Sequence, residues 1–312
     1  MHALALSQTS GELTAVQAIT EDLRRRFIDY IDAKPQTIAT YSRALRQLIG
    51  YLSTNGISQP TRGDILAYRD HLRQNYKPTT VQGYITASRL FFQWLEQEGL
   101  YQNVASKIKG AKLEKGHRKE ALSSQQMKAV QDAVGRDSLQ GLRDYAIITA
   151  MVTGALRTIE VARANIEDIR EAGGQRRLYI QGKGRDGKQE FIILTAEVST
   201  AINEYLEARQ AGDPSQPLFA ITSNNSRGGR LSTRSISGIV KQWLRKAGYD
   251  SDMLTAHSLR HTAITLALKA GQLPRAVQQF ARINSPIVME TYAHDMDRAE
   301  NKCEEAIALA IF

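Results

Sequence analysis

Apolar residues recur at helical spacing through the first third of the chain. Residues 16–31, 38–52, 61–75 and 79–98 each carry apolar side chains at three- and four-residue steps, the spacing of one face of an α-helix. Proline and glycine residues between these stretches supply turns. Four amphipathic helices in succession are enough to enclose a small core. We therefore predict a helical domain over residues 14–106.

The pattern changes after residue 121. Helical spacing covers residues 123–135, 139–152, 196–209, 232–247, 257–270, 274–282 and 286–293. Two short runs, 178–181 and 189–194, are rich in β-branched and aromatic residues, which is typical of strands. They flank a glycine-rich turn around Lys183, so a hairpin is expected. The sequence thus predicts a mainly α protein with one small antiparallel β-sheet, which lies in a second, α+β domain over residues 122–312.

Residues 107–121 join the two predicted domains as a basic linker. Between Lys107 and Lys119 the chain has six basic residues, one acidic residue and two glycines. Such a segment is either an ordinary solvated connector or a run of positive charge that lies along phosphates. The whole chain of 312 residues has 41 Lys and Arg against 32 Asp and Glu, a net charge of +9. This excess favours a polyanionic partner such as nucleic acid.

Composition excludes several classes of protein. Apolar residues make up 42% and charged residues 23%, a globular mixture rather than a disordered one. No run of apolar residues is long enough to predict a membrane span, and the N-terminus lacks the basic flank of a secretory signal. A single cysteine excludes internal disulfide bonds and Cys-rich zinc sites. We expect a cytoplasmic, nucleoid-associated protein.

The polar faces of the predicted helical domain carry cations, hydroxyls and an amide. This mixture suits contacts to phosphates and base edges, and it suits a plain solvated surface equally well. The candidate DNA-binding residues of this domain and the linker are Arg43, Lys77, Thr79, Thr80, Gln82, Arg89, Lys107, Lys109 and Lys112.

Several common enzyme signatures are missing from the sequence, which has no Walker A, G-x-S-x-G or H-E-x-x-H motif. His257 and His261 are four residues apart, but no cysteine is near and Arg260 stands between them, so we expect no metal site. What remains is a scattered set of cations and one tyrosine, namely Arg157, Lys183, His257, Arg260 and Tyr292.

One chemical task can use this whole set. A phosphodiester gains negative charge on its two non-bridging oxygens as it becomes pentacovalent, and two guanidiniums can bracket that charge. A histidine and a lysine can move the protons. A tyrosine can be the nucleophile, because its phosphate ester stores the bond energy for religation.

The chain resembles the tyrosine recombinase (phage integrase) family. The resemblance lies in an ordered set of motifs, Arg157-x-x-Glu160, Gly182-Lys183-Gly184, His257-x-x-Arg260 and Tyr292. It extends over nearly the whole chain, because the helical stretch at 14–106 looks like that family's SAM-like core-binding domain. The resemblance implies a core-binding domain followed by a tyrosine recombinase catalytic domain, in the compact layout of Xer-like members.

The same resemblance implies a role for each motif residue. Tyr292 would attack the scissile phosphate and leave a 3′-phosphotyrosyl link and a free 5′-hydroxyl. Arg157 and Arg260 would hold the non-bridging oxygens, Lys183 would protonate the leaving 5′ oxygen, and His257 would assist proton transfer at the nucleophile. The partner strand's hydroxyl would then attack the phosphotyrosine, so that strands exchange through a Holliday junction without metal, nucleotide or other cofactor.

Two further positions, Glu160 and Ile283, bear on the predicted site. Glu160 would be a supporting residue that orients Arg157 or His257. The family usually has a second His, or a Trp, nine residues before the nucleophile, within an LGH-like sequence, and here that position is Ile283. Isoleucine cannot donate to a phosphate, so either Arg282 or a neighbouring group takes over, or the site works with one donor fewer.

The resemblance also implies partners. We expect double-stranded DNA with an inverted-repeat core site, a dimer on each site and a tetramer in the synapse. An apolar stripe at helical spacing ends the chain, formed by Cys303, Ala306, Ile307, Ala310 and Ile311. In the family such a helix often docks on a neighbouring protomer; the alternative is that it folds back on its own domain.

Three functions remain open at this point. The first is a site-specific recombinase, for integration, excision or dimer resolution. The second is a type IB topoisomerase-like enzyme, which uses the same cleavage chemistry to relax supercoils as a monomer. The third is a non-catalytic DNA-binding regulator on the same fold, an alternative that Ile283 favours and the retained motif residues oppose.

Overall fold

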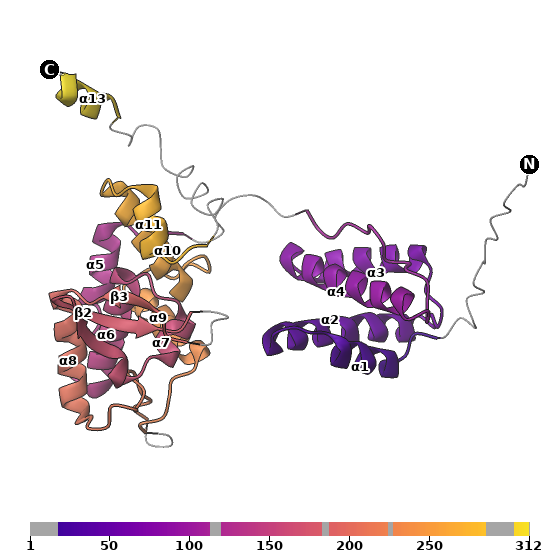
Figure 1. The fold of residues 1–312 in the computed structure, drawn as a ribbon, viewed down its shortest axis with the longest axis horizontal. Coiled ribbons are helices and arrows are strands. Elements are labelled where there is room, and N and C mark those ends of the chain that lie inside the picture. Colours follow the sequence, from indigo (N-terminus) through magenta and orange to yellow (C-terminus); the bar gives the residue numbers. More distant parts are fainter. Residues whose placement is uncertain (1–17, 113–119, 183–186, 224–226, 285–302, 312) are drawn as a thin grey trace, which may run out of the picture. The chain divides into compact units, whose positions relative to one another are not determined.

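The computed structural model describes residues 18–112, 120–182, 187–223, 227–284 and 303–311 (Figure 1). The chain divides into two compact units, one ending at Lys115 and the other beginning at Gly116. We describe each unit by itself. No helix within the described ranges is long and apolar enough to cross a membrane.

The N-terminal unit is a bundle of four helices. They are α1 (Glu21–Tyr30), α2 (Pro35–Thr54), α3 (Arg62–Asn75) and α4 (Pro78–Gln97). Proline at the first position starts α2 and α4, where its missing N–H costs nothing. A capping box starts α3, because the Thr61 side chain accepts from the backbone N–H of Asp64 and the Asp64 carboxylate accepts from that of Thr61. The four predicted helices are confirmed.

Aromatic rings fill much of the N-terminal core. The Phe27 and Phe91 rings meet edge to face with centroids 5.4 Å apart, and Trp94 lies 5.6 Å from Phe27. Ile108 is also buried in this core, and Arg73 donates to the Gly110 carbonyl at 3.0 Å. The first residues of the stretch predicted as a linker therefore pack on the N-terminal unit.

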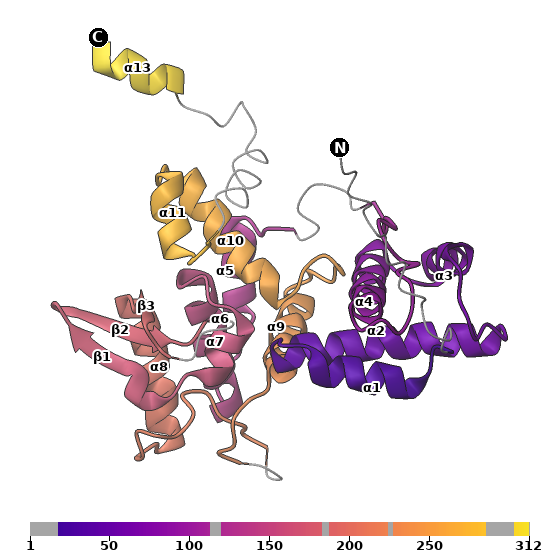
Figure 2. The same ribbon diagram turned by 45° about the vertical axis from the view of Figure 1, so that its right-hand side comes forward.

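The second unit is mainly helical. Its elements are α5 (Ser124–Asp132), α6 (Leu139–Thr153), α7 (Thr158–Arg163), the 3₁₀ turn η1 (Ile166–Asp168), β1 (Ile169–Ala172), β2 (Gln175–Ile180), β3 (Glu190–Ile193), α8 (Ala196–Arg209), α9 (Thr233–Lys246), α10 (Ala256–Lys269), α11 (Pro274–Phe280) and α13 (Cys303–Ile311). Helix α6 is the central element and is buried over most of its length. It packs against α8, α9 and α10 (Figure 2).

A three-stranded antiparallel sheet of order β1-β2-β3 accompanies these helices. Leu178 of β2 pairs with Ile169 on one side and Ile192 on the other. Gly173 and Gly174 connect β1 to β2 with φ angles of +59° and +70°, values that a type I′ hairpin turn requires. The predicted small sheet is confirmed, and β1 is an additional strand. The helix expected over 286–293 lies outside the described residues.

The second unit buries charged side chains in its interior. Arg143 and Asp144 are both buried, and two guanidinium nitrogens of Arg143 donate to one Asp144 oxygen at 2.7 and 2.9 Å. The indole N–H of Trp243 donates to the other Asp144 oxygen at 2.9 Å. The Asp144 carboxylate thus has partners on both oxygens, as a buried charge requires.

Candidate active site

Arg157 extends from the loop that follows α6. Gly154 caps the end of helix α6, and an added Cβ there would lie 2.5 Å from the terminal methyl of Ile192 of β3, so that Ile192 would have to move. Ala155 follows with φ +46°, and Arg157 is the N-cap of α7. The tight turn therefore places Arg157 at the junction of α6, α7 and β3.

Glu160, one turn into α7, holds Arg157 in place. Its carboxylate accepts from Nη1 of Arg157 at 2.7 Å and from the backbone N–H of Arg157 at 2.9 Å. The Glu160 side chain is fully buried, whereas that of Arg157 is 31% exposed. This is the contact that the predicted orienting role of Glu160 requires.

Helix α10 supplies the second arginine and the histidine. Arg260 is 3% exposed, and its Nη1 donates to the Ala155 carbonyl at 2.5 Å. Its Nη2 donates to the Ala281 carbonyl. His257 lies on the same helix three residues earlier and is exposed to solvent. The two residues are one helical turn apart, and they differ in that His257 is exposed and Arg260 is buried.

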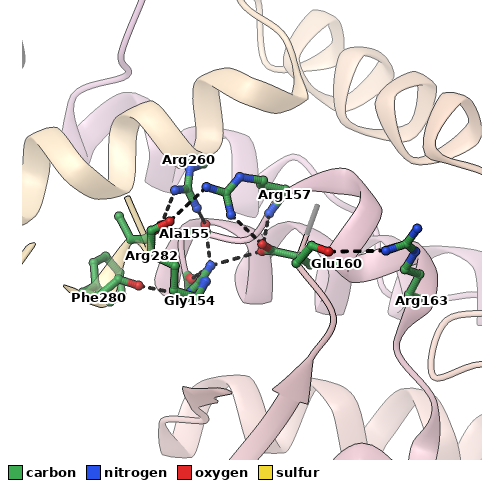
Figure 3. A network of polar contacts seen from close by, with 10 residues as sticks. Gly154, Ala155, Arg157, Glu160, Arg163, Arg260, Phe280 and Arg282 are labelled. Carbon is green, nitrogen blue, oxygen red and sulfur yellow. Dashed lines mark hydrogen bonds and ion pairs between the residues drawn. The ribbon is translucent and has the colours of Figure 1, made fainter. Parts of the chain in front are cut away.

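The two arginines meet at the turn after α11. Arg260 donates to the Ala281 carbonyl, and Nη2 of Arg157 donates to the Arg282 carbonyl at 3.2 Å (Figure 3). Side chains separated by about a third of the chain therefore converge on two consecutive peptide groups. Two guanidiniums beside each other form a site of positive charge that suits an anion with two acceptor oxygens.

Ile283 stands at the position of the missing second histidine, and Arg282 precedes it. Ile283 packs against a small apolar cluster beneath α10 and α11, and Gln278 donates to its carbonyl at 3.0 Å. The Arg282 guanidinium lies inside the unit, where it donates to Glu160 at 3.1 Å and to the carbonyls of Gly154, Ala155 and Phe280. Arg282 therefore does not present its donors to a phosphate in this conformation.

Burial has an electrostatic consequence at Arg282. Loss of hydration lowers the pKa of its guanidinium, and the Glu160 carboxylate opposes this change. The sequence indicated Arg282 as a candidate donor to the phosphate, but it did not predict that its side chain points into the unit and binds Glu160. A signal was available, because Arg282 stands where the LGH-like sequence has glycine.

Two of the predicted catalytic residues, Lys183 and Tyr292, lie outside the described residues. The described part of the chain brings together Arg157, Glu160 and Arg260. Near Lys183, the Gly182 carbonyl accepts from Arg163 of α7 at 3.4 Å, so the β2 end of the predicted hairpin contacts the same short helix that carries Glu160.

The candidate DNA-binding residues lie on the N-terminal unit. Those that are exposed are Arg43, Lys77, Thr79, Arg89, Lys107, Lys109 and Lys112. Thr80 and Gln82 are half-buried, and the Gln82 side chain is in close contact with Gly110. Thr79, Gln82 and Arg89 follow at spacings of three and seven along α4, which places them on one helix face. Within the described ranges, no three His, Cys, Asp or Glu side chains are grouped so as to hold a metal.

Comparison with known proteins identifies the family. Residues 120–298 match the phage integrase family, and residues 25–99 match the phage integrase N-terminal SAM-like domain. The first match covers more than half of the chain. This protein belongs to the phage integrase family, the tyrosine recombinases.

Relatives and structures extend this result. A tyrosine recombinase of Synechocystis sp. is 30% identical over 83% of this chain and 87% of its own length. Tyrosine recombinase XerC of Pelobacter propionicus is 31% identical over 85% of this chain and 86% of its own length. A lambda integrase dimer bound to a COC′ core site has the same fold, with a TM-score of 0.72 at 17% identity over 90% of this chain and 79% of that one. The structure of XerH bound to its difH substrate has a TM-score of 0.67 at 19% identity, over 87% of this chain and 79% of that one. The two family matches confirm the predicted fold, a SAM-like core-binding domain followed by a catalytic domain.

Proposed function

We propose that this protein is a site-specific DNA recombinase that cleaves and rejoins duplex DNA through a 3′-phosphotyrosyl intermediate and a Holliday junction. The observation that carries the proposal is the convergence of Arg157 and Arg260 on consecutive carbonyls, with Glu160 behind them. Family membership supports the same reading of the site.

The mechanism follows from the chemistry of the arginines. In the described conformation their Nη atoms donate to backbone carbonyls. A phosphodiester carries a full negative charge and binds guanidinium more strongly than a carbonyl does, so its two non-bridging oxygens replace those carbonyls as acceptors. The oxygen of Tyr292 attacks phosphorus, the bond to the 5′ oxygen breaks, and Lys183 gives that oxygen a proton while His257 assists the nucleophile. The reverse attack by a 5′-hydroxyl restores the diester.

The N-terminal unit binds the duplex in this proposal. Its exposed cations on α2 and α4, and the basic residues after α4, contact phosphates, while Thr79 and Gln82 reach base edges. A relative with the same fold is a lambda integrase tetramer bound to a Holliday junction, and others are DNA-bound dimers, which supports a dimer on each site and a tetramer in the synapse. The protein acts on DNA in the cytoplasm.

Helix α13 couples the protomers of this assembly. Its Ile307, Leu309 and Ile311 side chains are 58–86% exposed, an apolar surface that gains free energy when it docks on a neighbour. Truncation near residue 296 is expected to weaken assembly on a two-site DNA more than affinity for a single site. Gel-shift titrations on the two DNAs measure this difference.

A covalent trap tests the function. The protein is incubated with sheared DNA of its source genome and quenched in denaturant, and attached DNA is sequenced, with Tyr292→Phe as the matched control. Tyrosine-dependent attachment at one or a few palindromic sites is the expected result. Attachment spread over random sequence would identify a topoisomerase-like enzyme instead. DNA binding without any attachment would favour a regulator or an enzyme that a partner activates.

A further inference from the structure

The buried carboxylate of Glu160 is shared by two arginines. One oxygen accepts from Nη1 of Arg157 at 2.7 Å, and the other accepts from Nη2 of Arg282 at 3.1 Å and from the Arg157 backbone N–H at 2.9 Å (Figure 3). The Glu160 side chain has no exposed surface, so solvent contributes nothing to neutralising it. Within the described part of the chain, these neighbours balance its charge.

The two arginines differ in their freedom to move. The Arg282 side chain is 5% exposed, and its guanidinium also donates to three backbone carbonyls, those of Gly154, Ala155 and Phe280. The Arg157 side chain is 31% exposed and is held to the turn by a single carbonyl. Arg282 is thus a fixed partner of Glu160, and Arg157 is a partner that can turn toward solvent.

Arg282 occupies its position at a cost. Its backbone has φ +53°, a left-handed conformation that disfavours any residue with a Cβ. Its Nε is buried and has no hydrogen-bond partner among the residues that the structure describes, which carries a further cost. A glycine would avoid both. A side chain retained against such costs points to a functional requirement.

We propose that Arg282 is a positioning residue for DNA cleavage: it is the permanent counter-ion of Glu160, so that Arg157 can shift its Nη2 donor from the Arg282 carbonyl to the scissile phosphate without carrying the whole charge of Glu160. A buried carboxylate that loses its counter-ion is strongly destabilised. With Arg157 as its only partner, Glu160 would hold that arginine back from the phosphate. With Arg282 in place, Glu160 stays paired during the step. This inference rests on the recombinase function proposed above.

The first variant is Arg282→Gly. Glycine adopts φ +53° without strain, so the change removes the guanidinium and leaves the backbone conformation intact. The measurement is single-turnover cleavage of the trapped DNA site at saturating protein, beside the equilibrium affinity for the same DNA. We expect cleavage about 100-fold slower, because Arg157 is misplaced at the reacting phosphate, and an affinity within about threefold of wild type.

A second change tests the charge argument directly. In the double variant Arg282→Gly/Glu160→Gln, no uncompensated carboxylate remains to hold Arg157. We expect this double variant to cleave at least about 10-fold faster than Arg282→Gly alone. The effects of two independent structural defects would instead add, and the double variant would then be slower than the single one. Arg275→Gln is the matched control. It removes an equal charge from an exposed position on neighbouring α11 and leaves the rate unchanged.

Each outcome bears on a different claim. Wild-type cleavage by Arg282→Gly, or a double variant no faster than the single one, overturns the role of Arg282. If Arg282→Gly does not fold, as judged by circular dichroism, Arg282→Gln carries the test: its neutral amide keeps hydrogen bonds but not the charge, and a wild-type rate overturns the proposal. A wild-type protein that forms no Tyr292-dependent adduct overturns the proposed function instead.

Discussion

The two units of the protein treat charge in opposite ways. Among the described residues of the N-terminal unit, Arg24 is the one buried charged side chain, and it pairs with Glu21 at the edge of the bundle. The core there is apolar and aromatic. The described part of the second unit instead buries Arg143, Asp144, Glu160, Asp168 and Arg260.

The difference follows from what each unit has to bind or do. Charges on a surface can adapt to a polyanion and are screened by salt. Charges inside a protein are costly to desolvate, so they persist where fixed orientation is needed. The N-terminal unit should therefore tolerate changes of charge, and the second unit should not. The two tryptophans of the chain, Trp94 and Trp243, report on the two units separately.

The largest contrast is expected for Arg143→Met. It leaves the buried Asp144 without its counter-ion, and unfolding of the second unit should become easier by about 3–5 kcal/mol. Denaturant titration followed by Trp243 fluorescence, in a Trp94→Phe background, measures it. Arg69→Met is the matched control, since its partner Asp70 in the N-terminal unit is 54% exposed and solvent screens the pair, which is worth less than about 1 kcal/mol. Equal losses in the two variants would remove the contrast.

Phe91→Ala tests the apolar side of the comparison. Phe91 is fully buried between Phe27, Phe92 and Trp94, and its truncation should destabilise the N-terminal unit by about 3–5 kcal/mol. The loss should be the same at low and high salt, because no charge is involved. Trp94 fluorescence in a Trp243→Phe background follows it. Leu90→Ala, on the exposed side of the same helix, should cost about 0.5 kcal/mol or less. A salt-dependent loss in Phe91→Ala would contradict this account.

Arg89→Ala tests surface charge as a binding device. If Arg89 contacts a phosphate, its loss should reduce the slope of log affinity against log salt by about one and leave stability unchanged. Fluorescence anisotropy with the trapped site at several salt concentrations measures the slope. Arg245→Ala, which removes an exposed arginine paired with Asp250, is the control and should leave the slope unchanged. An unchanged slope in Arg89→Ala would remove this residue from the DNA interface.

The smallest effect concerns pH. A hydrogen bond from Arg24 lowers the pKa of Glu21 below its ordinary value. A lowered folded-state pKa stabilises the protein above the unfolded pKa, and this contribution is lost as pH falls through the folded value. Because Glu21 is 44% exposed, solvent screening keeps the contribution below about 1 kcal/mol. Glu21→Gln should lower the Tm of the N-terminal unit at pH 7 and leave it unchanged near pH 2. A loss that persists at acid pH would assign Glu21 another role.

The sequence predicted the longer helices well, because each has enough turns for its apolar spacing to be seen. Helix α7 has six residues, too few for such a pattern. Strand β1 reads Ile-Arg-Glu-Ala and lacks alternation, since it is an edge strand created by the turn at Gly173 and Gly174. The burial of Ile108 was also missed, although Val104 and Ile108 stand four residues apart and form an apolar pair.

The candidate site was predictable where its partners are close in the chain. The spacing Arg157-x-x-Glu160 places the two side chains one helical turn apart, and they are in contact. The contact between Glu160 and Arg282 spans 122 residues, and no spacing rule reaches that far. The direction of the Arg282 side chain depends on the left-handed backbone at that residue, which a pattern of apolar positions does not encode.

The convergence at the turn after α11 also orders events during synthesis. The contacts that join Arg260 and the turn after α11 to residues 154–160 span 105 to 128 positions, whereas the N-terminal bundle is complete before that stretch is made. Domains fold largely in order as the ribosome produces them, and long-range contacts form late. A nascent chain therefore has its helical bundle well before it has paired arginines, and a truncated translation product ending before Ala281 has the first without the second.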